Sequence, residues 1–154
     1  MFFANDVIKQ STLETSTPPS PEVVPTISLD IPSFHQKLID NKGLIIFKFG
    51  ATWCKPCKVV EPHFNQFFQF ARSKEEEKPY KIECVNIDVD DSFELYATMK
   101  RLRMVKGLPT FLAFYKGNHS YIAEDSAIGS DIPLLQNFFT RCYGFVEKKS
   151  FPPS

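Results

Sequence analysis

Two cysteines three residues apart, Cys54 and Cys57, are the side chains of this chain with the clearest capacity for chemistry. Thiols at this spacing can close a small disulfide ring or open to a dithiol. Residues 44–49 before them have the composition of a buried strand, and residues 57–72 after them carry apolar side chains at helical spacing. At a helix start the first thiol would point outward at the positive end of the macrodipole, which favours the thiolate. A strand leading into such a pair is typical of redox chemistry.

The same pair could instead be half of a zinc site, which needs two further ligands. The other donors in the chain fall at no zinc spacing: Cys84, Cys142, His35, His63 and His119. We therefore expect no metal and no bound cofactor. Cys142 falls on the apolar stripe of the last predicted helix and Cys84 in a predicted strand, so we interpret both thiols as structural, with a redox role as the alternative.

The overall composition narrows the class of partner and the compartment. Eighteen basic and eighteen acidic side chains cancel to a formal net charge of zero, which predicts neither nucleic acid nor a membrane as a partner. The four cysteines are too few and too unevenly spaced for a secreted disulfide scaffold, so we expect an intracellular, cytoplasmic protein. Residues 1–6 lack the basic start and the apolar run of a signal peptide, and no stretch approaches the roughly 18 apolar residues of a membrane span.

Length and composition also predict the domain organisation. The chain has 154 residues, and 16 phenylalanines supply enough apolar side chains for one core. Ten of the fifteen residues from 11 to 25 are Ser, Thr or Pro, so residues 1–25 are predicted to be a flexible arm. The folded domain is expected over residues 26–146, followed by a frayed tail over residues 147–154.

The pattern of the domain predicts an α/β fold with a mixed five-stranded sheet and helices on both faces. Strands are expected at residues 26–29, 44–49, 80–88, 110–115 and 119–123, the last two joined as a hairpin by a tight turn at residues 116–118. Helices are expected from Pro32, from the cysteine pair with a bend at Pro62, from a capping box of Asp91 and Glu94, and from Ser130.

From about residue 26 to residue 143 the chain resembles the thioredoxin family. Residues 51–58, Ala-Thr-Trp-Cys-Lys-Pro-Cys-Lys, are similar to the family's Trp-Cys-Gly-Pro-Cys-Lys box, and other matching features are Pro62, residues 85–88, residues 107–110, residues 116–117 and Gly129. The resemblance implies a small single-domain thioredoxin fold and a thiol–disulfide oxidoreductase that serves electron transport and cell redox homeostasis. It also implies that Pro109 is a cis-proline facing the disulfide.

The resemblance and the chemistry of thiols together assign roles at the site. Cys54 is expected to be the nucleophile and Cys57 the resolving thiol, which displaces the reduced substrate from a mixed disulfide. Pro56 would fix the turn, while Trp53 and Pro109 would form the apolar rim on which an extended substrate lies. Lys55, in the place of the family's glycine, adds an exposed and heavily screened cation.

Lys48 departs from the family pattern. It occupies the position of a buried acid that assists proton transfer at the second thiol, and Cys84 occupies the position of that acid's partner lysine. A lysine in a central strand is costly unless it is paired or reaches water. One hypothesis is that Lys48 lies behind Cys57 and tunes its pKa, by stabilising the thiolate or by taking the proton as a neutral amine. The alternative is a side chain that reaches the surface and is silent.

The leading functional prediction is an enzyme that reduces or exchanges protein disulfides through a Cys54–Cys57 dithiol/disulfide cycle. Its partners would be protein disulfides and a reductase or thiol electron donor, and we expect a monomer. One alternative is a binding module of the same fold, tethered by its arm to a larger assembly, with little turnover. An isomerase or oxidant would differ only in redox potential. The arm also suggests an alternative location, in which the protein is packaged in a virion or an organelle.

Overall fold

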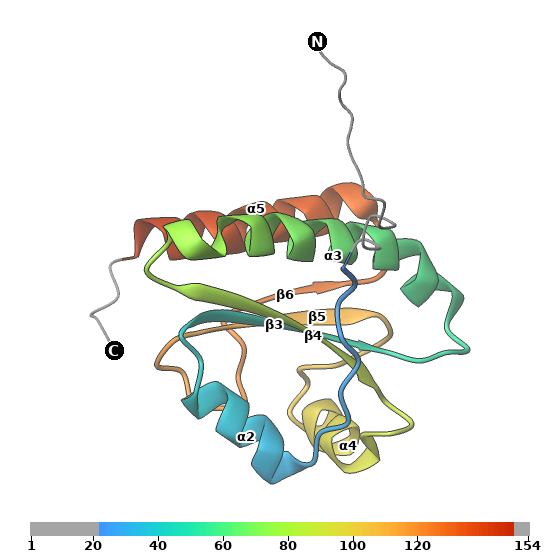
Figure 1. Ribbon diagram of the computed structural model, residues 1–154. Helices are drawn as coiled ribbons and strands as arrows, with labels where there is room; N and C mark the ends of the chain where they lie inside the picture. Colours follow the sequence, from blue (N-terminus) through green and yellow to red (C-terminus); the bar gives the residue numbers. More distant parts are fainter. Residues whose placement is uncertain (1–21, 150–154) are drawn as a thin grey trace, which may run out of the picture.

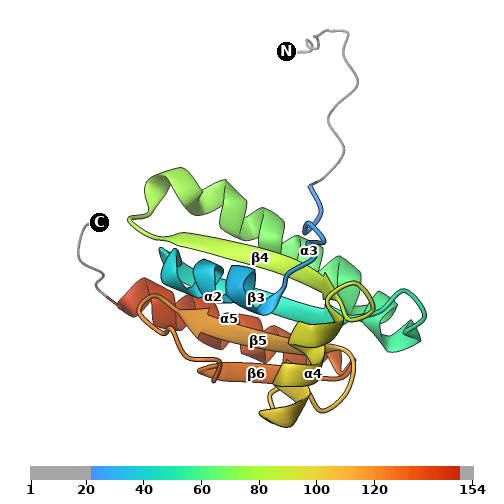
Figure 2. The same ribbon diagram turned by 90° about the horizontal axis from the view of Figure 1, so that it is seen from below.

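Four strands form a mixed sheet in the order β4-β3-β5-β6 within residues 22–149, the part of the chain that the computed structural model describes. The central strand β3 pairs in parallel with β4 and antiparallel with β5, and β5 pairs antiparallel with β6. Figure 2 shows this order across the sheet. The strands are β3 (Gly43–Gly50), β4 (Lys81–Asp88), β5 (Thr110–Tyr115) and β6 (Asp125–Ile128).

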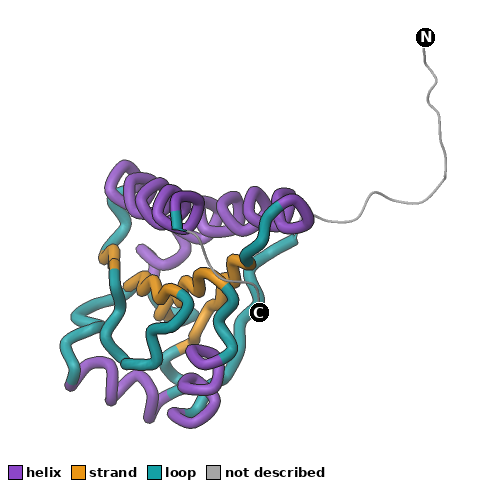
Figure 3. The backbone as a smooth tube through the Cα atoms, turned by 90° about the vertical axis from the view of Figure 1, so that its left-hand side faces the viewer, coloured by secondary structure: helices purple, strands orange, loops and turns teal. Residues whose placement is uncertain are grey.

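Helices cover both faces of this sheet and make a three-layer molecule (Figures 1 and 3). Helices α3 (Lys55–Lys74) and α5 (Ile132–Lys148) lie side by side on one face. The opposite face carries α2 (Ile31–Ile39) and α4 (Phe93–Arg101), and the short 3-10 helix η1 (Glu75–Glu77) leads from α3 to β4. The predicted α/β class with helices on both faces is confirmed.

The middle strands are buried on both sides, which explains their unbroken apolar runs. Every residue of β3 and β5 is buried. Because successive side chains of a strand point to opposite faces, Leu44 and Ile46 pack under α3 and α5, while Phe47 and Phe49 pack against α2 and α4. Lys48 breaks this run on the α3 side, and that break creates the candidate site described below.

The predicted first strand at residues 26–29 is wrong, so the described sheet has four strands rather than five. Thr26 forms only an isolated parallel bridge with Asn86 of β4. The carbonyl of Pro25 accepts from the N–H of Asn86, and the N–H of Ile27 donates to the carbonyl of Asn86. Pro25 itself has no N–H that could extend the ladder. The N–H of Leu29 then bonds to a side chain of another element instead of continuing the ladder.

The predicted hairpin strand at residues 119–123 is also wrong, because the strand after β5 begins at Asp125. The Asn118 side chain accepts from the N–H of Ser120 and donates to the carbonyl of Ile122, which folds these residues into a loop. Glu124 holds the other end of the loop by accepting from Asn118 and from the N–H of Tyr115. The tight turn therefore becomes a connection over residues 116–124.

Two predicted helix caps are displaced by one residue. Ser92, not Asp91, precedes α4, and its hydroxyl accepts from the N–H of Leu29, so no side chain caps that helix. The cap of α5 is Asp131, not Ser130, and its carboxylate accepts from the N–H of Leu134 at 3.2 Å. In both cases the neighbouring residue is an equally good capping type, so residue preference alone could not decide between the two positions.

The folded region extends beyond the predicted boundaries of residues 26 and 146. Val24 is 4% exposed and its N–H donates to Asn65 of α3 at 3.0 Å, while Gln69 of α3 donates to the carbonyl of Glu22. At the other end α5 continues to Lys148. The rest of the predicted arm and tail, residues 1–21 and 150–154, lies outside the described residues. Over residues 22–149, no helix has the length and apolar character needed to cross a membrane.

Candidate redox site

The two cysteines lie where β3 leads into α3. β3 ends at Gly50, a short turn follows in which the N–H of Cys54 donates to the carbonyl of Ala51, and α3 begins at Lys55. Cys54 is the N-cap with extended backbone, and its Sγ accepts from the N–H of Cys57 at 3.2 Å. Pro56 lies in the first turn, where a missing N–H costs no helical hydrogen bond.

Cys54 and Cys57 form a disulfide, with their Cα atoms 5.3 Å apart. The two residues are 5% and 4% exposed, so in this oxidised form they are equally buried. Cys54 Sγ sits at the N-terminus of a 20-residue helix and already accepts a backbone hydrogen bond. Both the bond and the macrodipole favour negative charge there, so the arrangement suits a thiolate once the disulfide opens.

Trp53, next to the disulfide, is held by a residue that the sequence interpretation missed. The residue is 66% exposed, and its Nε1 donates to the Asp90 carboxylate at 2.9 Å. Asp90 follows the end of β4, and β3 and β4 are parallel, so the loops after both strands meet at one edge of the sheet. That parallel pairing was the signal available for placing Asp90 near the cysteines. Lys55 is exposed at the start of α3.

Pro109 immediately precedes β5, and the Leu108–Pro109 peptide bond is cis. The pairing of Thr110 with Phe49 places Pro109 beside the end of β3 that leads to Cys54. The carbonyl of Pro109 accepts from the N–H of Gly129 at 2.9 Å, which ties this turn to the end of β6. The register of the sheet therefore places the turn before Cys54 and the turn at Pro109 at the same edge of the sheet.

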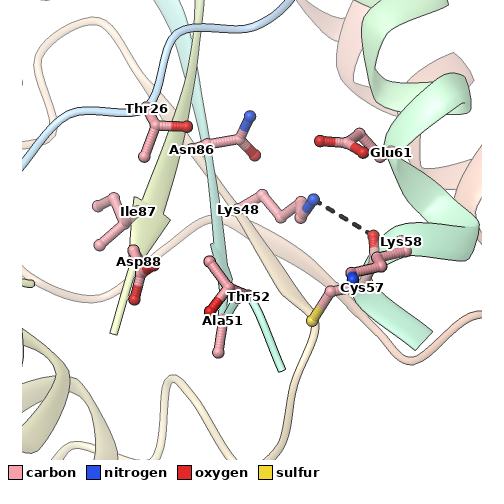
Figure 4. A pocket seen from close by; sticks show the side chains of 11 residues that line it. Thr26, Lys48, Ala51, Thr52, Cys57, Lys58, Glu61, Asn86, Ile87 and Asp88 are labelled. Atoms are coloured by element: carbon pink, nitrogen blue, oxygen red, sulfur yellow. Dashed lines mark hydrogen bonds between the residues drawn. The ribbon is translucent and has the colours of Figure 1, made fainter. Parts of the chain in front are cut away.

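Lys48 lies under the start of α3, with 6% of its surface exposed, and what is exposed opens into a cavity rather than onto the outer surface of the sheet. Its Nζ donates to the backbone carbonyl of Cys57 at 3.4 Å (Figure 4). Burial lowers the pKa of Lys48, and the charge of Glu61 acts in the opposite direction. The amine borders a cavity of about 370 Å³ between β3, β4 and α3, which is also lined by Cys57 and Glu61.

Glu61 and Asn86 complete this cavity, and the sequence interpretation assigned neither to the site. Glu61 lies on α3 four residues after Cys57, a spacing that places both on one side of a helix. Asn86 pairs with Lys48 across the two parallel strands, and its Oδ1 is buried without a hydrogen-bond partner. Glu61 could have been found from helical spacing, whereas Asn86 needed the register of β4 against β3.

Gly50 allows the close approach of strand and helix at this point. A Cβ at Gly50 would lie 3.2 Å from Cys57 Sγ and 3.4 Å from Lys48 Cε. The contact with the sulfur is tighter than most van der Waals contacts, whereas the contact with Lys48 Cε is at the limit of an ordinary one, so a larger residue at this position must displace the sulfur by a few tenths of an ångström. Cys57 Sγ and the end of the Lys48 side chain therefore border the same small space.

Cys84 and Cys142 are free thiols buried in the core between the sheet and the α3–α5 layer. Burial raises the pKa of both, to about 12 for Cys142, which also interacts with the hydroxyl of Tyr115. Neither lines the cavity at Lys48. Their structural interpretation remains a prediction. Among the described residues, no group of three or more His, Cys, Asp or Glu side chains is arranged to hold a metal ion.

The sequence is similar to that of known proteins over most of its described length. The sequence model of the family described as Thioredoxin matches residues 25–133. Thioredoxin Asp f 29 of Aspergillus fumigatus is 32% identical over 107 residues, which are 70% of this chain and 84% of the relative. Thioredoxin of Oryctolagus cuniculus is 34% identical over 87 residues, which are 55% of this chain and 71% of the relative.

Solved structures share the fold. Thioredoxin of Malassezia sympodialis (Mala s 13) has a TM-score of 0.59 at 25% identity, with 79% of this chain and 94% of that chain covered. Mitochondrial thioredoxin 3 of Saccharomyces cerevisiae, in its oxidized form, has a TM-score of 0.56 at 22% identity, with 77% and 94% covered.

Proposed function

This chain belongs to the thioredoxin family and is a thiol–disulfide oxidoreductase, and we propose that Cys54 and Cys57 carry its cycle on the disulfides of other proteins. The observation that supports this assignment is the Cys54–Cys57 disulfide at the N-terminus of α3, with Cys54 Sγ accepting the N–H of Cys57. A hydrogen bond donated to Cys54 Sγ stabilises its thiolate, which makes Cys54 more acidic than a thiol in water. Cys54 is therefore the attacking sulfur and Cys57 the resolving one.

The cycle balances as two exchanges. The Cys54 thiolate attacks one sulfur of a substrate disulfide, forming a mixed disulfide and releasing the other substrate sulfur as a thiolate, which takes a proton. Cys57 then loses its proton and attacks Cys54 Sγ, which releases the second substrate thiol and closes the Cys54–Cys57 disulfide. An external dithiol or reductase returns two electrons and two protons. No bound cofactor enters these steps.

The substrate is assigned to the surface between Trp53 and Pro109. Trp53 is exposed and held by Asp90, and Pro109 stands beside the end of β3 that leads to Cys54. A flat, rigid ring beside a reactive sulfur suits an extended peptide that carries a disulfide, because little side-chain entropy is lost when it binds. Members of the family act on protein disulfides and receive electrons from reductases. For this chain we assign the same class of partners, a monomeric state and the cytoplasm, where thiol pools remain reduced.

The test is the reduction of insulin by dithiothreitol in the presence of the full chain. The wild-type chain should accelerate the reaction, and Cys54→Ser should abolish the acceleration. Cys57→Ser should instead accumulate a mixed disulfide with substrate at Cys54, which is visible by non-reducing electrophoresis and mass spectrometry. Cys142→Ala, which removes a buried thiol outside the site, is the matched control and should retain activity.

Two results would contradict the proposal. Equal activity of Cys54→Ser and wild type would remove Cys54 from the cycle. A chain that forms the Cys54–Cys57 dithiol and disulfide reversibly but does not accelerate insulin reduction would instead be a binding module with the fold of the family.

A further inference from the structure

The amine of Lys48 and the sulfur of Cys57 occupy one buried space between β3 and α3. Lys48 Nζ donates to the Cys57 carbonyl at 3.4 Å. Lys48 Cε and Cys57 Sγ both lie within van der Waals reach of the position that a Cβ on Gly50 would take. Both side chains line the same cavity of about 370 Å³, and Figure 4 shows the amine pointing to the backbone of Cys57 at the start of α3.

The charged and polar groups facing Lys48 come from every segment that borders this cavity. Figure 4 shows the Glu61 carboxylate and the Asn86 amide pointing toward the lysine amine. Asn86 Oδ1 is buried and has no partner, so it can accept from an amine or ammonium that turns toward it. The full set is Cys57, Lys58 and Glu61 from α3, Asn86 and Asp88 from β4, Thr52 from the turn before α3, and Thr26 from the segment beside β4.

This setting makes the protonation of Lys48 depend on Cys57. Burial lowers the pKa of Lys48, which favours the neutral amine, while Glu61 partly offsets that effect. A thiolate forming on Cys57 would place a negative charge beside the same cavity and would favour the ammonium. Thiolate and ammonium thus stabilise each other, and a proton passed between them creates both charges at once.

On the basis of the proposed function, we propose that Lys48 is the proton acceptor for Cys57 when Cys57 resolves the mixed disulfide. The proton of Cys57 Sγ moves to Lys48 Nζ, the Cys57 sulfur bonds to Cys54 Sγ, and the bond between Cys54 and the substrate sulfur breaks. The substrate leaves as a thiolate. The Lys48 ammonium then loses its proton to water at the mouth of the cavity, beside exposed Glu61, and the released thiolate takes up a proton from the solvent.

The test uses the reduced full chain and 5,5′-dithiobis(2-nitrobenzoate), which reports each sulfur by its coloured product. Attack by Cys54 releases one 5-thio-2-nitrobenzoate at a rate proportional to reagent concentration. Attack by Cys57 on the resulting mixed disulfide releases the second at a rate independent of that concentration. Both rates are followed by stopped flow between pH 5 and pH 10. The other two thiols are buried with raised pKa values, so we expect them to react with the reagent more slowly than the two thiols of the site.

Lys48→Met should slow the second release about tenfold at neutral pH and move the midpoint of its pH profile up by about one unit. The first release should keep its rate, because Cys54 obtains its activation from the helix N-terminus. Lys48→Gln should behave as Lys48→Met does and supplies the same measurement if the methionine variant does not fold. The matched control is Lys148→Met, which removes an exposed cation in the last turn of α5 and should alter neither phase.

A second phase with unchanged rate and pH profile in both Lys48 variants would overturn this proposal and leave the Cys54–Cys57 cycle intact. A second phase that slows by the same factor at every pH would also overturn it. Its pH midpoint would then be unmoved, as expected if Lys48 only supports the local structure and does not accept the proton. If the wild-type chain shows no second phase at all, it is the assignment of Cys57 as the resolving thiol that fails.

Discussion

Replacing Gly50 by alanine should make the Cys54–Cys57 disulfide easier to reduce. The new methyl group would lie 3.2 Å from Cys57 Sγ and 3.4 Å from Lys48 Cε. The lysine end can turn away, since it is the far end of a flexible side chain. The sulfur cannot do so while it is bonded to Cys54, but in the dithiol it is free to rotate. The strain therefore falls on the oxidised form.

The expected size follows from the cost of overpacking, which is about 1–3 kcal/mol for an added methylene in a packed core. A displacement of a few tenths of an ångström belongs at the lower end, so about 1 kcal/mol is expected. Because about 1.4 kcal/mol corresponds to 30 mV for a two-electron couple, the reduction potential of Gly50→Ala should rise by about 20 mV.

The potential is measured by equilibrating each protein with mixtures of reduced and oxidised dithiothreitol and trapping the free thiols with an alkylating reagent. Urea unfolding of the oxidised and the reduced proteins gives an independent value, because the same 1 kcal/mol should appear as a loss of stability in the oxidised form alone. A potential that is unchanged or lower would refute the reasoning. So would an equal loss of stability in both redox states.

Three further outcomes are expected. Gly144 lies in the interior of α5, and no atom lies within 4 Å of the Cβ that an alanine would add. Gly144→Ala should raise the free energy of unfolding by about 0.5–1 kcal/mol without changing the reduction potential. It is therefore also the control for Gly50→Ala. Val24→Ala should cost about 2 kcal/mol in urea unfolding, because Val24 is buried in the core; no loss would mean that residues 22–25 do not contribute to the folded domain. Hydrogen bonds from Ser33 lower the pKa of Asp30 in the folded state. The stabilisation by Asp30 is therefore complete above the unfolded pKa of 3.8 and is lost as the pH falls through the lower folded value. The urea midpoints of wild type and Asp30→Asn should therefore converge on acidification below about pH 4. A constant difference between the two midpoints would contradict this.

Features that depend on neighbours along the chain were predictable from the sequence. The start of α3 was readable because Pro56 suits the first turn of a helix and the residues after it carry apolar side chains at helical spacing, and both are properties of consecutive residues. The buried strand before it was readable because a strand covered on both faces must be apolar along its whole length. The fold class followed from the order of such segments.

The errors arose where a local preference was weak and a distant partner decided. The segment at residues 26–29 has the alternation of a strand, but its N–H groups are divided between Asn86 of β4 and Ser92 at the start of α4. Ser92 was consequently not available to cap α4. The loop after β5 is set by Asn118 and Glu124, whose side chains compete with strand pairing for the backbone.

The sequence by itself determined that two cysteines stand at the start of a helix after a buried strand, because spacing and burial pattern are properties of consecutive residues. It also showed that a lysine interrupts that strand. Only the tertiary structure decided what surrounds the lysine, since the parallel register of β3 and β4 brings Asn86 to it and the packing of α3 brings Glu61 and the Cys57 carbonyl. The electrostatics of the site depend on these contacts across elements, and residues distant in the chain meet only when the layers pack.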